Sequence, residues 1–598
     1  MLKIIIELFS LLTANQRRRF YMLQVLVVIM SFAEIVSIAS IVPFMALIGD
    51  LSILEKDNLL AVLYFESNLN NPYEFIFYLG IFVLITLVIA ASVSMFVAWR
   101  LSMFATQVGV EIADRLYSYY LNQDWLFHTT GSTSNLTKKI AVESPRVTVQ
   151  ILLPLVQMNA RIILIFLILL IMLLYDPIIV AVGFVVFSLP YVILFKFVRN
   201  RLQRNGKNIS NMFEERFKLM SEGFGGIKDV LLFGRSRDFK KRFSKTGDKL
   251  AHNQGTNIAI SHVPRYFMEL LAFGSMISLV LYLVINAQGY AGLLLPTLSV
   301  YALTGMKLLP ALQQTYGSIA QIKANLPAYE SIREDLKNIN AEIEPKVESN
   351  QQPWLKHNEV DLKNITFCYP GKVIPALESV SIKIKPNSTV GFVGTSGSGK
   401  STLADVIIGL IKPQQGEVII DGIPLIKKNL RAWQDKIGFV PQSIFLTEGT
   451  IAENVAFGIQ QDLINYNQVQ KALKLAHLEE WVSELELGIH SKVGERGVQL
   501  SGGQRQRIGI ARALYYEADI LVFDEATSAL DGITEKTILD AIQDFKGQKT
   551  LIMIAHRLKT IQNCDQIFMM EKGCVIDCGT YQQLLEKNEK FKKMSGHA

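Results

Sequence analysis

The chain of 598 residues has only four cysteines, and none of them stands in a C-x-x-C pair. Their spacing argues against a zinc site or a disulfide framework, so we expect idle thiols in a reducing cytosol. A secretory signal is also missing, since the first apolar stretch contains Glu7 and leads into basic residues instead of a cleavage site. The net charge of +7 is modest for this length, which argues against a nucleic-acid partner.

Apolar runs with few charges are concentrated before about Met306, and six of them approach the ~20 residues that a helix needs to cross hydrocarbon. As core helices of a soluble protein, these runs would leave too little polar surface to cover them. The sequence therefore predicts an amphipathic helix on the membrane surface over residues 1–19 and a transmembrane domain over 20–324. The six predicted spans cover residues 20–49, 75–105, 150–175, 177–197, 264–286 and 290–317.

Loop charge predicts the orientation of these spans. The segment 198–262 holds 14 lysines and arginines against six acids, whereas the loop 50–74 holds five acids and one lysine. Because basic loops stay on the cytoplasmic side, both chain termini are predicted to be cytoplasmic. The inner segments 101–149 and 198–262 are long and polar, so we expect them to continue the membrane helices into the cytosol.

Four charged residues are singled out inside the predicted spans, away from the span ends that reach the cytosol, namely Glu34, Arg161, Glu269 and Lys307. A charge in the middle of a membrane helix costs ~2.5–3.5 kcal/mol on insertion scales, so each of them needs a reason to be there. Two interpretations stay open. The four residues form ion pairs between helices, or they line a polar cavity that receives a charged lipid headgroup.

A charged linker over residues 325–355 leads into an α/β pattern over 356–598. There the strand "STVGFV" runs into "GTSGSGKST" and then into an apolar helix, which is the phosphate-binding loop G-x-x-x-x-G-K-S in its required context. Backbone N–H groups and the helix N-terminus would bind phosphate, Lys400 would reach the outer phosphates, and Ser401 would face Mg²⁺. The predicted ATP-binding residues of this loop are Gly394, Thr395, Ser396, Gly397, Ser398, Gly399, Lys400, Ser401 and Thr402.

Two further buried strands end in candidate catalytic residues. "ADILVFDE" ends in Asp524, which is placed to hold the Mg²⁺ shell, and Glu525, which is placed to orient or deprotonate the attacking water. "TLIMIAHR" brings His556 to a strand end, where it could reach the γ-phosphate.

These motifs make residues 356–598 resemble the nucleotide-binding domain of ABC transporters, with the full motif set in order. The resemblance implies that Tyr369 stacks on adenine, that Gln442 contacts Mg²⁺ and takes part in catalysis, and that His556 is the switch histidine. It assigns Glu495 to coupling with the membrane domain. It also adds to the ATP-binding residues the signature residues Ser501, Gly502, Gly503 and Gln504 and the D-loop residue Asp531.

The whole chain resembles a type IV exporter half-transporter, in which a six-helix transmembrane α domain precedes an α/β P-loop domain. In this family the signature of one subunit closes over the ATP of another, so the resemblance implies a dimer. Because every motif is intact, we expect a homodimer, with a heterodimer containing a degenerate partner as the alternative. The coupling loops are expected near Asp124–Ser134 and Glu222–Val230, with Gln442 and Glu495 on the receiving side.

The substrate is less well marked. "SFAEIVSIASIVPFMALIGD", "VPRYFMELLAFG" and the outer loop are similar to stretches of the Pgl-type bacterial flippases for lipid-linked oligosaccharides. This resemblance favours an ATP-driven flippase that moves a polyprenyl-pyrophosphate-linked oligosaccharide to the outer leaflet of the bacterial inner membrane. An exporter of lipid A, phospholipid or peptide stays open, as does an ATP-gated channel or regulator. A soluble-type ATPase that remodels protein or DNA is disfavoured by the six spans.

Overall fold

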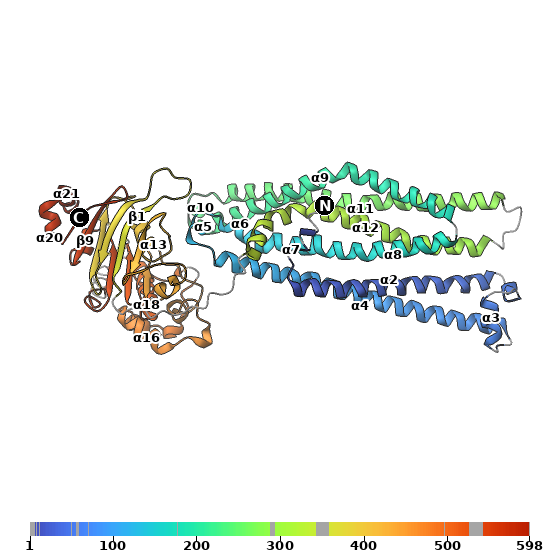
Figure 1. Ribbon diagram of the computed structural model, residues 1–598, viewed down its shortest axis with the longest axis horizontal. Helices are drawn as coiled ribbons and strands as arrows, with labels where there is room; N and C mark the ends of the chain where they lie inside the picture. The colour runs from blue at the N-terminus through green and yellow to red at the C-terminus, as the bar shows by residue number, and fades with distance from the viewer. Residues whose placement is uncertain are drawn as a thin grey trace. The chain divides into compact units, whose positions relative to one another are not determined.

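The computed structural model describes residues 6–7, 9–10, 12–49, 51–55, 59–67, 69, 71–175, 177–286, 294–341, 358–494, 497–525, 542–555 and 557–596. Contacts between residues divide the chain into two units. The first comprises residues 1–123 and 127–344, and the second comprises residues 124–126 and 345–598. Figure 1 shows that the first unit is built of long helices and that the second contains strands with shorter helices around them.

Six long helices form the first unit, and each overlaps one of the predicted spans. They are α2 (Ala14–Gly49), α4 (Pro72–Leu121), α8 (Leu153–Tyr175), α9 (Pro177–Gly225), α11 (Ser236–Asn286) and α12 (Leu294–Ala341). The 50 residues of α4 measure about 75 Å along the helix axis, far more than a bilayer core requires. Among the described residues, three stretches have the length and hydropathy of a membrane span: Ala14–Gly49, Pro72–Leu121 and Thr133–Leu173.

Short elements connect the long helices. The outer loop holds a 3-10 turn (Leu51–Glu55) and α3 (Leu59–Glu66), and the first inner loop holds α5 (Trp125–Thr130), α6 (Thr133–Lys138) and α7 (Ser144–Val147). Two π-helical turns, Lys139–Glu143 and Thr148–Leu152, flank α7. The second inner loop holds α10 (Ile227–Leu232). A short helix therefore occurs in each of the two expected coupling loops.

Large apolar side chains cover the outward faces of the long helices. More than half of the surface of each of the following side chains is exposed: Phe32, Phe82, Leu84, Val88 and Phe166. Val27 and Val97 are fully buried between α2 and α4, so the helices also pack on one another through apolar contacts. Faces of this kind are far more apolar than the surface of a soluble monomer, and they suit contact with the hydrocarbon tails of a lipid bilayer.

The segment 325–355, which the sequence suggested as a linker, is helical as far as Ala341 because α12 continues into it. Tyr329, Ile332 and Leu336 lie at three- and four-residue spacing and are buried in the hydrophobic cluster of the first unit. This apolar stripe gives the helix a packed face, which the surrounding charges obscure in the sequence.

Two sheets form the second unit. An antiparallel sheet has the order β2–β1–β4–β5, and a larger sheet has the order β10–β9–β3–β8–β7–β6. Within the larger sheet, β9, β3, β8, β7 and β6 run parallel, and β10 pairs antiparallel with β9. The strands are β1 (Val360–Phe367), β2 (Leu377–Ile384), β3 (Thr389–Gly394), β4 (Gln415–Ile420), β5 (Ile423–Pro424), β6 (Ile437–Val440), β7 (Ile520–Asp524), β8 (Thr550–Ile554), β9 (Gln566–Glu571) and β10 (Cys574–Gly579).

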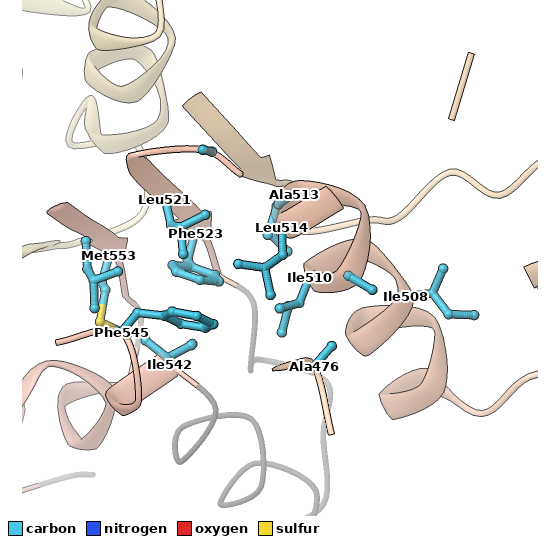
Figure 2. Close-up of a cluster of buried hydrophobic side chains, with 14 of the residues drawn as sticks. Ala476, Ile508, Ile510, Ala513, Leu514, Leu521, Phe523, Ile542, Phe545 and Met553 are labelled. Atoms are coloured by element: carbon cyan, nitrogen blue, oxygen red, sulfur yellow. The ribbon is translucent and has the colours of Figure 1, made fainter. Parts of the chain in front are cut away.

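Helices cover this larger sheet and supply its core. They include α13 (Lys400–Ile407), α14 (Leu430–Gln434), α15 (Ile451–Val455), α16 (Tyr466–Leu475), α17 (Glu479–Ser483), α18 (Gly502–Tyr515), α20 (Tyr581–Lys587) and α21 (Glu589–Ser595). β3 and β8 are buried at every position, as expected for parallel strands covered on both faces. In Figure 2, Ile510 and Leu514 of α18 lie with Leu521 and Phe523 of β7 in one hydrophobic cluster.

Candidate nucleotide site and transmembrane polar cluster

The phosphate-binding loop joins the buried strand β3 to α13. Gly399 is the N-cap of α13 and has φ of +100°, a conformation that favours glycine. A Cβ at this position would lie 2.5 Å from the carbonyl oxygen of Ala376, so no larger residue fits. Residues 395–397 are exposed, which leaves the backbone at the start of the helix open to an anion.

Lys400 lies folded back into its own loop. Its Nζ donates to the carbonyl oxygens of Gly394 at 2.9 Å and Thr395 at 3.1 Å, and only 4% of the residue is exposed. Burial lowers the pKa of Lys400, while the charges of Glu525 and Asp524 act in the opposite direction. The buried ammonium group therefore lies in the field of two carboxylates and follows the exposed residues 395–397 of the phosphate loop.

Sheet topology brings the other predicted residues to the same edge. β3, β8, β7 and β6 are parallel neighbours, so their carboxyl ends meet at one edge of the sheet. The phosphate loop follows β3, Glu525 follows β7 and Gln442 follows β6 by two residues. The motifs that lie far apart in the sequence therefore converge where open α/β sheets bind ligands.

Glu525 has an unusual backbone conformation. Its φ is +51°, in the left-handed region that few non-glycine residues occupy. The backbone N–H of Glu525 donates to the carbonyl oxygen of Ile554 at 3.0 Å, and Nε2 of Gln442 donates to its Oε2 at 2.7 Å. A strained residue that its neighbours hold in place is common at functional sites.

The signature stretch begins α18. Ser501 is the N-cap, and it forms a capping box in which its hydroxyl accepts from the N–H of Gln504 and its own N–H donates to the Gln504 side chain. Ser501 and Gly502 are exposed, whereas Gly503 is buried. The start of a 14-residue helix, with its positive dipole end, is therefore exposed at Ser501 and Gly502, which suits an anionic ligand.

Tyr369 is tied to the phosphate-loop helix. Its hydroxyl lies 3.1 Å from Oγ1 of Thr402, and its ring makes an edge contact with Phe367 at a centroid distance of 5.0 Å. This pairing fixes an aromatic ring beside the start of α13.

Three predicted residues, Glu495, Asp531 and His556, lie outside the described residues.

Asp405 is a residue near this site that sequence reasoning missed. Burial, followed by the charge of Asp524, raises the pKa of its carboxyl to about 6. The signal was available, because a lone acid stands in the apolar helix "TLADVIIGL" after the phosphate loop.

Comparisons with known proteins agree with this geometry. Residues 377–528 match the family model for the ABC transporter domain, and residues 21–308 match the model for the ABC transporter transmembrane region. An ATP-dependent lipid A-core flippase of Escherichia coli strain K12 is 30% identical over 509 residues, which cover 84% of this chain and 86% of the relative. A protein of the same description from Shigella flexneri is 30% identical over 508 residues, with the same shares covered.

The chain belongs to the ABC transporter family. It has the type IV exporter fold and is an ATP-hydrolysing transporter. The solved structure of a bacterial Atm1-family ABC exporter with ATP bound matches it with a TM-score of 0.78 and 22% identity, over 98% of this chain and 99% of that chain.

The transmembrane unit of the transporter contains a polar cluster around Glu34, which is 7% exposed. Nη1 of Arg161 lies 3.6 Å from Oε1 of Glu34, and the hydroxyl of Ser94 donates to the same oxygen at 3.0 Å. Nε of Arg161 donates to Oε1 of Gln314 at 2.6 Å. Four helices (α2, α4, α8 and α12) thus contribute to one cluster, and two of the four predicted charges meet in it.

The other two charges do not pair with each other or with this cluster. Oε1 of Glu269 accepts from Nε of Arg265 at 2.7 Å, within α11. Lys307 is exposed, and no ion pair to it is present in the part of the chain that the structure describes. The sequence analysis missed Arg265, although its spacing of four residues from Glu269 is a known signal of a helical ion pair.

Proposed function

We propose that this transporter works as a homodimer in the bacterial inner membrane and flips an amphipathic anionic lipid. The favoured substrate is a polyprenyl-pyrophosphate-linked oligosaccharide, moved from the cytoplasmic to the outer leaflet. The observation that carries the proposal is the guanidinium of Arg161, which contacts Glu34 and Gln314 among the long helices of the transmembrane unit. In this proposal both termini and the nucleotide unit are cytoplasmic, because the segment 198–262 is strongly basic.

Within each ATP site, Lys400 and the loop N–H groups bind the phosphates and Tyr369 stacks on adenine. Ser401, Asp524 and Gln442 would hold Mg²⁺, and this donor set fits, because each offers an oxygen and the ion prefers oxygen ligands. When bound, Mg²⁺ neutralises charge on the phosphates.

The catalytic roles in the proposal follow from the contact between two side chains. Glu525 orients or deprotonates the attacking water, and its hydrogen bond to Gln442 fixes the direction of its carboxylate. His556, Asp531 and Glu495 take the family's switch, D-loop and coupling roles.

A homodimer is supported by an apolar segment in the second inner loop. Leu231, Leu232 and Phe233 are 66%, 76% and 68% exposed at the end of α10, although this loop is cytosolic in the proposed topology. Exposed patches of large apolar side chains commonly mark protein interfaces.

Mixed dimers test whether the ATP sites are shared. When a Lys400→Ala subunit is combined with a Ser501→Arg subunit, one composite site loses both the phosphate-loop lysine and the signature serine. The other composite site keeps both. We expect partial ATPase activity in the mixed dimer and none in either homodimer. A mixed dimer that is as inactive as its parents, together with no crosslink between positions 501 and 396 of different chains, would contradict sharing.

Substrate recognition is proposed to use the cations of the transmembrane unit. At 3.6 Å, the contact between Arg161 and Glu34 is longer than a hydrogen bond, so an anion can compete for the guanidinium. A phosphate accepts charge-assisted hydrogen bonds, which are stronger than neutral ones. Lys307 adds a second cation, and a homodimer doubles both.

Lipid A is the second candidate, because the relatives that share 30% identity over most of this chain are lipid A-core flippases. Its phosphorylated sugar headgroup presents the same charge to Arg161 as a pyrophosphate does. The two candidates therefore share an anionic glycolipid chemistry and differ in the lipid tail and sugars.

Proteoliposomes distinguish these substrates. We expect ATP-dependent translocation of a polyprenyl-pyrophosphate-linked oligosaccharide, and slower or no movement of lipid A and of a zwitterionic phospholipid. Vesicles with the Glu525→Gln variant provide the matched control. Faster movement of lipid A would replace the first substrate by the second, and ATPase activity without movement of any of the three lipids would favour a gated channel or regulator.

A further inference from the structure

The loop that carries Gln442 is fastened to the helix that carries the signature. We define the Gln442 loop as residues 441–450, which join β6 to α15. Gln442 contacts Glu525 of its own subunit, whereas Ser501 starts α18, at the far end of that helix from Arg512. The attachment therefore joins the Gln442 loop, which belongs to the subunit's own ATP site, to α18. In the proposed dimer, the start of α18 contacts the ATP of the partner subunit.

Arg512 makes the central contacts. Its Nε donates to the carbonyl oxygen of Asn454 at 2.8 Å, and its Nη1 donates to the carbonyl oxygen of Phe445 at 3.0 Å. The guanidinium also lies 4.5 Å from the ring centroid of Phe457. One rigid fork thus holds two segments of backbone and an aromatic ring at fixed positions relative to α18.

Asn454 extends the attachment into the loop. It is fully buried, and its amide nitrogen donates to the carbonyl oxygens of Thr447 at 3.1 Å and Thr450 at 3.0 Å. Its Oδ1 accepts from the N–H of Thr447 at 2.9 Å and from Nη2 of Arg512 at 3.4 Å. The side chain uses both its donors and its acceptor to define where the loop ends and α15 begins.

Close packing reinforces the same contact. A Cβ on Gly509 of α18 would lie 2.5 Å from Cδ1 of Ile444, so a larger residue would force the Ile444 side chain to move. Leu446 of the loop is also buried. Side-chain packing and hydrogen bonds therefore act at the same place.

The charge of Arg512 has no carboxylate partner among the described residues, and its hydrogen bonds go to carbonyl and amide oxygens. Burial lowers the pKa of this guanidinium, which shows that the environment disfavours its charge. Partly burying a charge without a counter-charge is costly compared with an apolar side chain that fills the same space. What an apolar residue lacks is the ability to fix two carbonyl groups at once.

We propose that Arg512 is a positioning residue that clamps the Gln442 loop to α18 and thereby links the two ATP sites of the dimer. The inference rests on the proposed sharing of sites between subunits. Movement of the Gln442 loop at one site would change the position of Ser501 at the other. Loss of the clamp would slow hydrolysis at both sites, while ATP binding to the phosphate loop stays unchanged.

Site-resolved mixed dimers test this inference. One subunit carries Arg512→Lys, which keeps the charge but lacks the planar fork of donors that holds the carbonyls of Asn454 and Phe445 in a fixed geometry. Glu525→Gln is then placed in the same subunit, so that only the partner's phosphate loop hydrolyses ATP, or in the partner, so that only the variant's own loop does. We expect kcat to fall in both arrangements by about tenfold relative to matching dimers without Arg512→Lys, the effect of one charge-assisted hydrogen bond.

A fall in kcat in only one arrangement would overturn the proposed clamp, because Arg512 would then act locally on one element. Unchanged kcat in both arrangements would also overturn it. Arg507→Lys is the matched control, because Arg507 lies on the same helix and donates to the carbonyl oxygen of His477 instead of the loop. It should leave the variant's own site unaffected. If Arg512→Lys does not fold, Asn454→Asp serves instead, since it removes the bonds donated to Thr447 and Thr450. Failure of site sharing is separate, because it abolishes complementation between Lys400→Ala and Ser501→Arg subunits with Arg512 intact.

Discussion

The two units of this transporter place their polar groups in different ways. In the nucleotide unit, the phosphate-loop lysine and the signature serine stand at helix starts and are held by groups close in the sequence, as with Lys400 and the carbonyl of Gly394. In the transmembrane unit, the contacts of the Glu34 cluster join side chains far apart in the sequence, as with Arg161 and Gln314, which are 153 residues apart. Local sequence motifs therefore specify the nucleotide site, whereas the transmembrane polar cluster depends on how the helices pack.

The largest expected effect lies in the nucleotide unit. Glu525→Gln keeps the size of the side chain but removes its basic oxygen, so hydrolysis should fall ~10²–10⁴-fold while ATP still binds. Measuring ATPase turnover and nucleotide affinity of the purified variant checks this. Near-normal turnover would remove Glu525 from its proposed role.

Gly206→Ala tests how far the transmembrane unit depends on close helix packing. A Cβ at Gly206 of α9 would lie 1.8 Å from the carbonyl oxygen of Ala324 in α12, so the helices must separate. Overpacking of this kind costs about 1–3 kcal/mol, and thermal unfolding in detergent should show a lower midpoint. Gly183→Ala, where a Cβ meets nothing within 4 Å, is the control and should unfold as the wild type does.

Arg161 and Lys307 separate pairing from substrate contact. Lys307→Ala should slow flipping several-fold without loss of stability, since no ion pair to Lys307 occurs among the described residues. Arg161→Ala should slow flipping and also lower stability, because it leaves the buried carboxylate of Glu34 without its positively charged neighbour. Unfolding and flipping assays on the single variants and on Arg161→Ala with Glu34→Gln measure both effects. Full flipping in the double variant would make Arg161 a structural residue.

Asp405→Asn should change how the stability of the nucleotide unit depends on pH. The folded pKa of about 6 lies above the unfolded value of 3.8, so the folded state binds the proton more tightly. Wild-type stability should therefore decrease as pH rises through this window, and the asparagine variant should lose that decrease and be more stable at pH 7. Unfolding midpoints of the full-length protein across the window provide the measurement.

The sequence predicted the family, the six helical regions and the convergence of the ATP motifs, because each depends on contiguous patterns. It left open whether Glu34 and Arg161 pair, since pairing depends on how α2 and α8 face each other. Ser94 and Gln314 carried no signal, because uncharged polar residues are common in helices. The attachment of Arg512 to Phe445 was also invisible, since backbone carbonyls have no sequence signature.

We propose that ATP hydrolysis at the two sites that depend on Glu525 drives lipid movement. The most direct measurement records phosphate release and translocation of the pyrophosphate-linked lipid in the same proteoliposomes, for the wild type and for Glu525→Gln. We expect both rates to be measurable in the wild type and to fall together in the variant. Undiminished translocation in the variant, or wild-type hydrolysis with no movement of any anionic glycolipid, would contradict it.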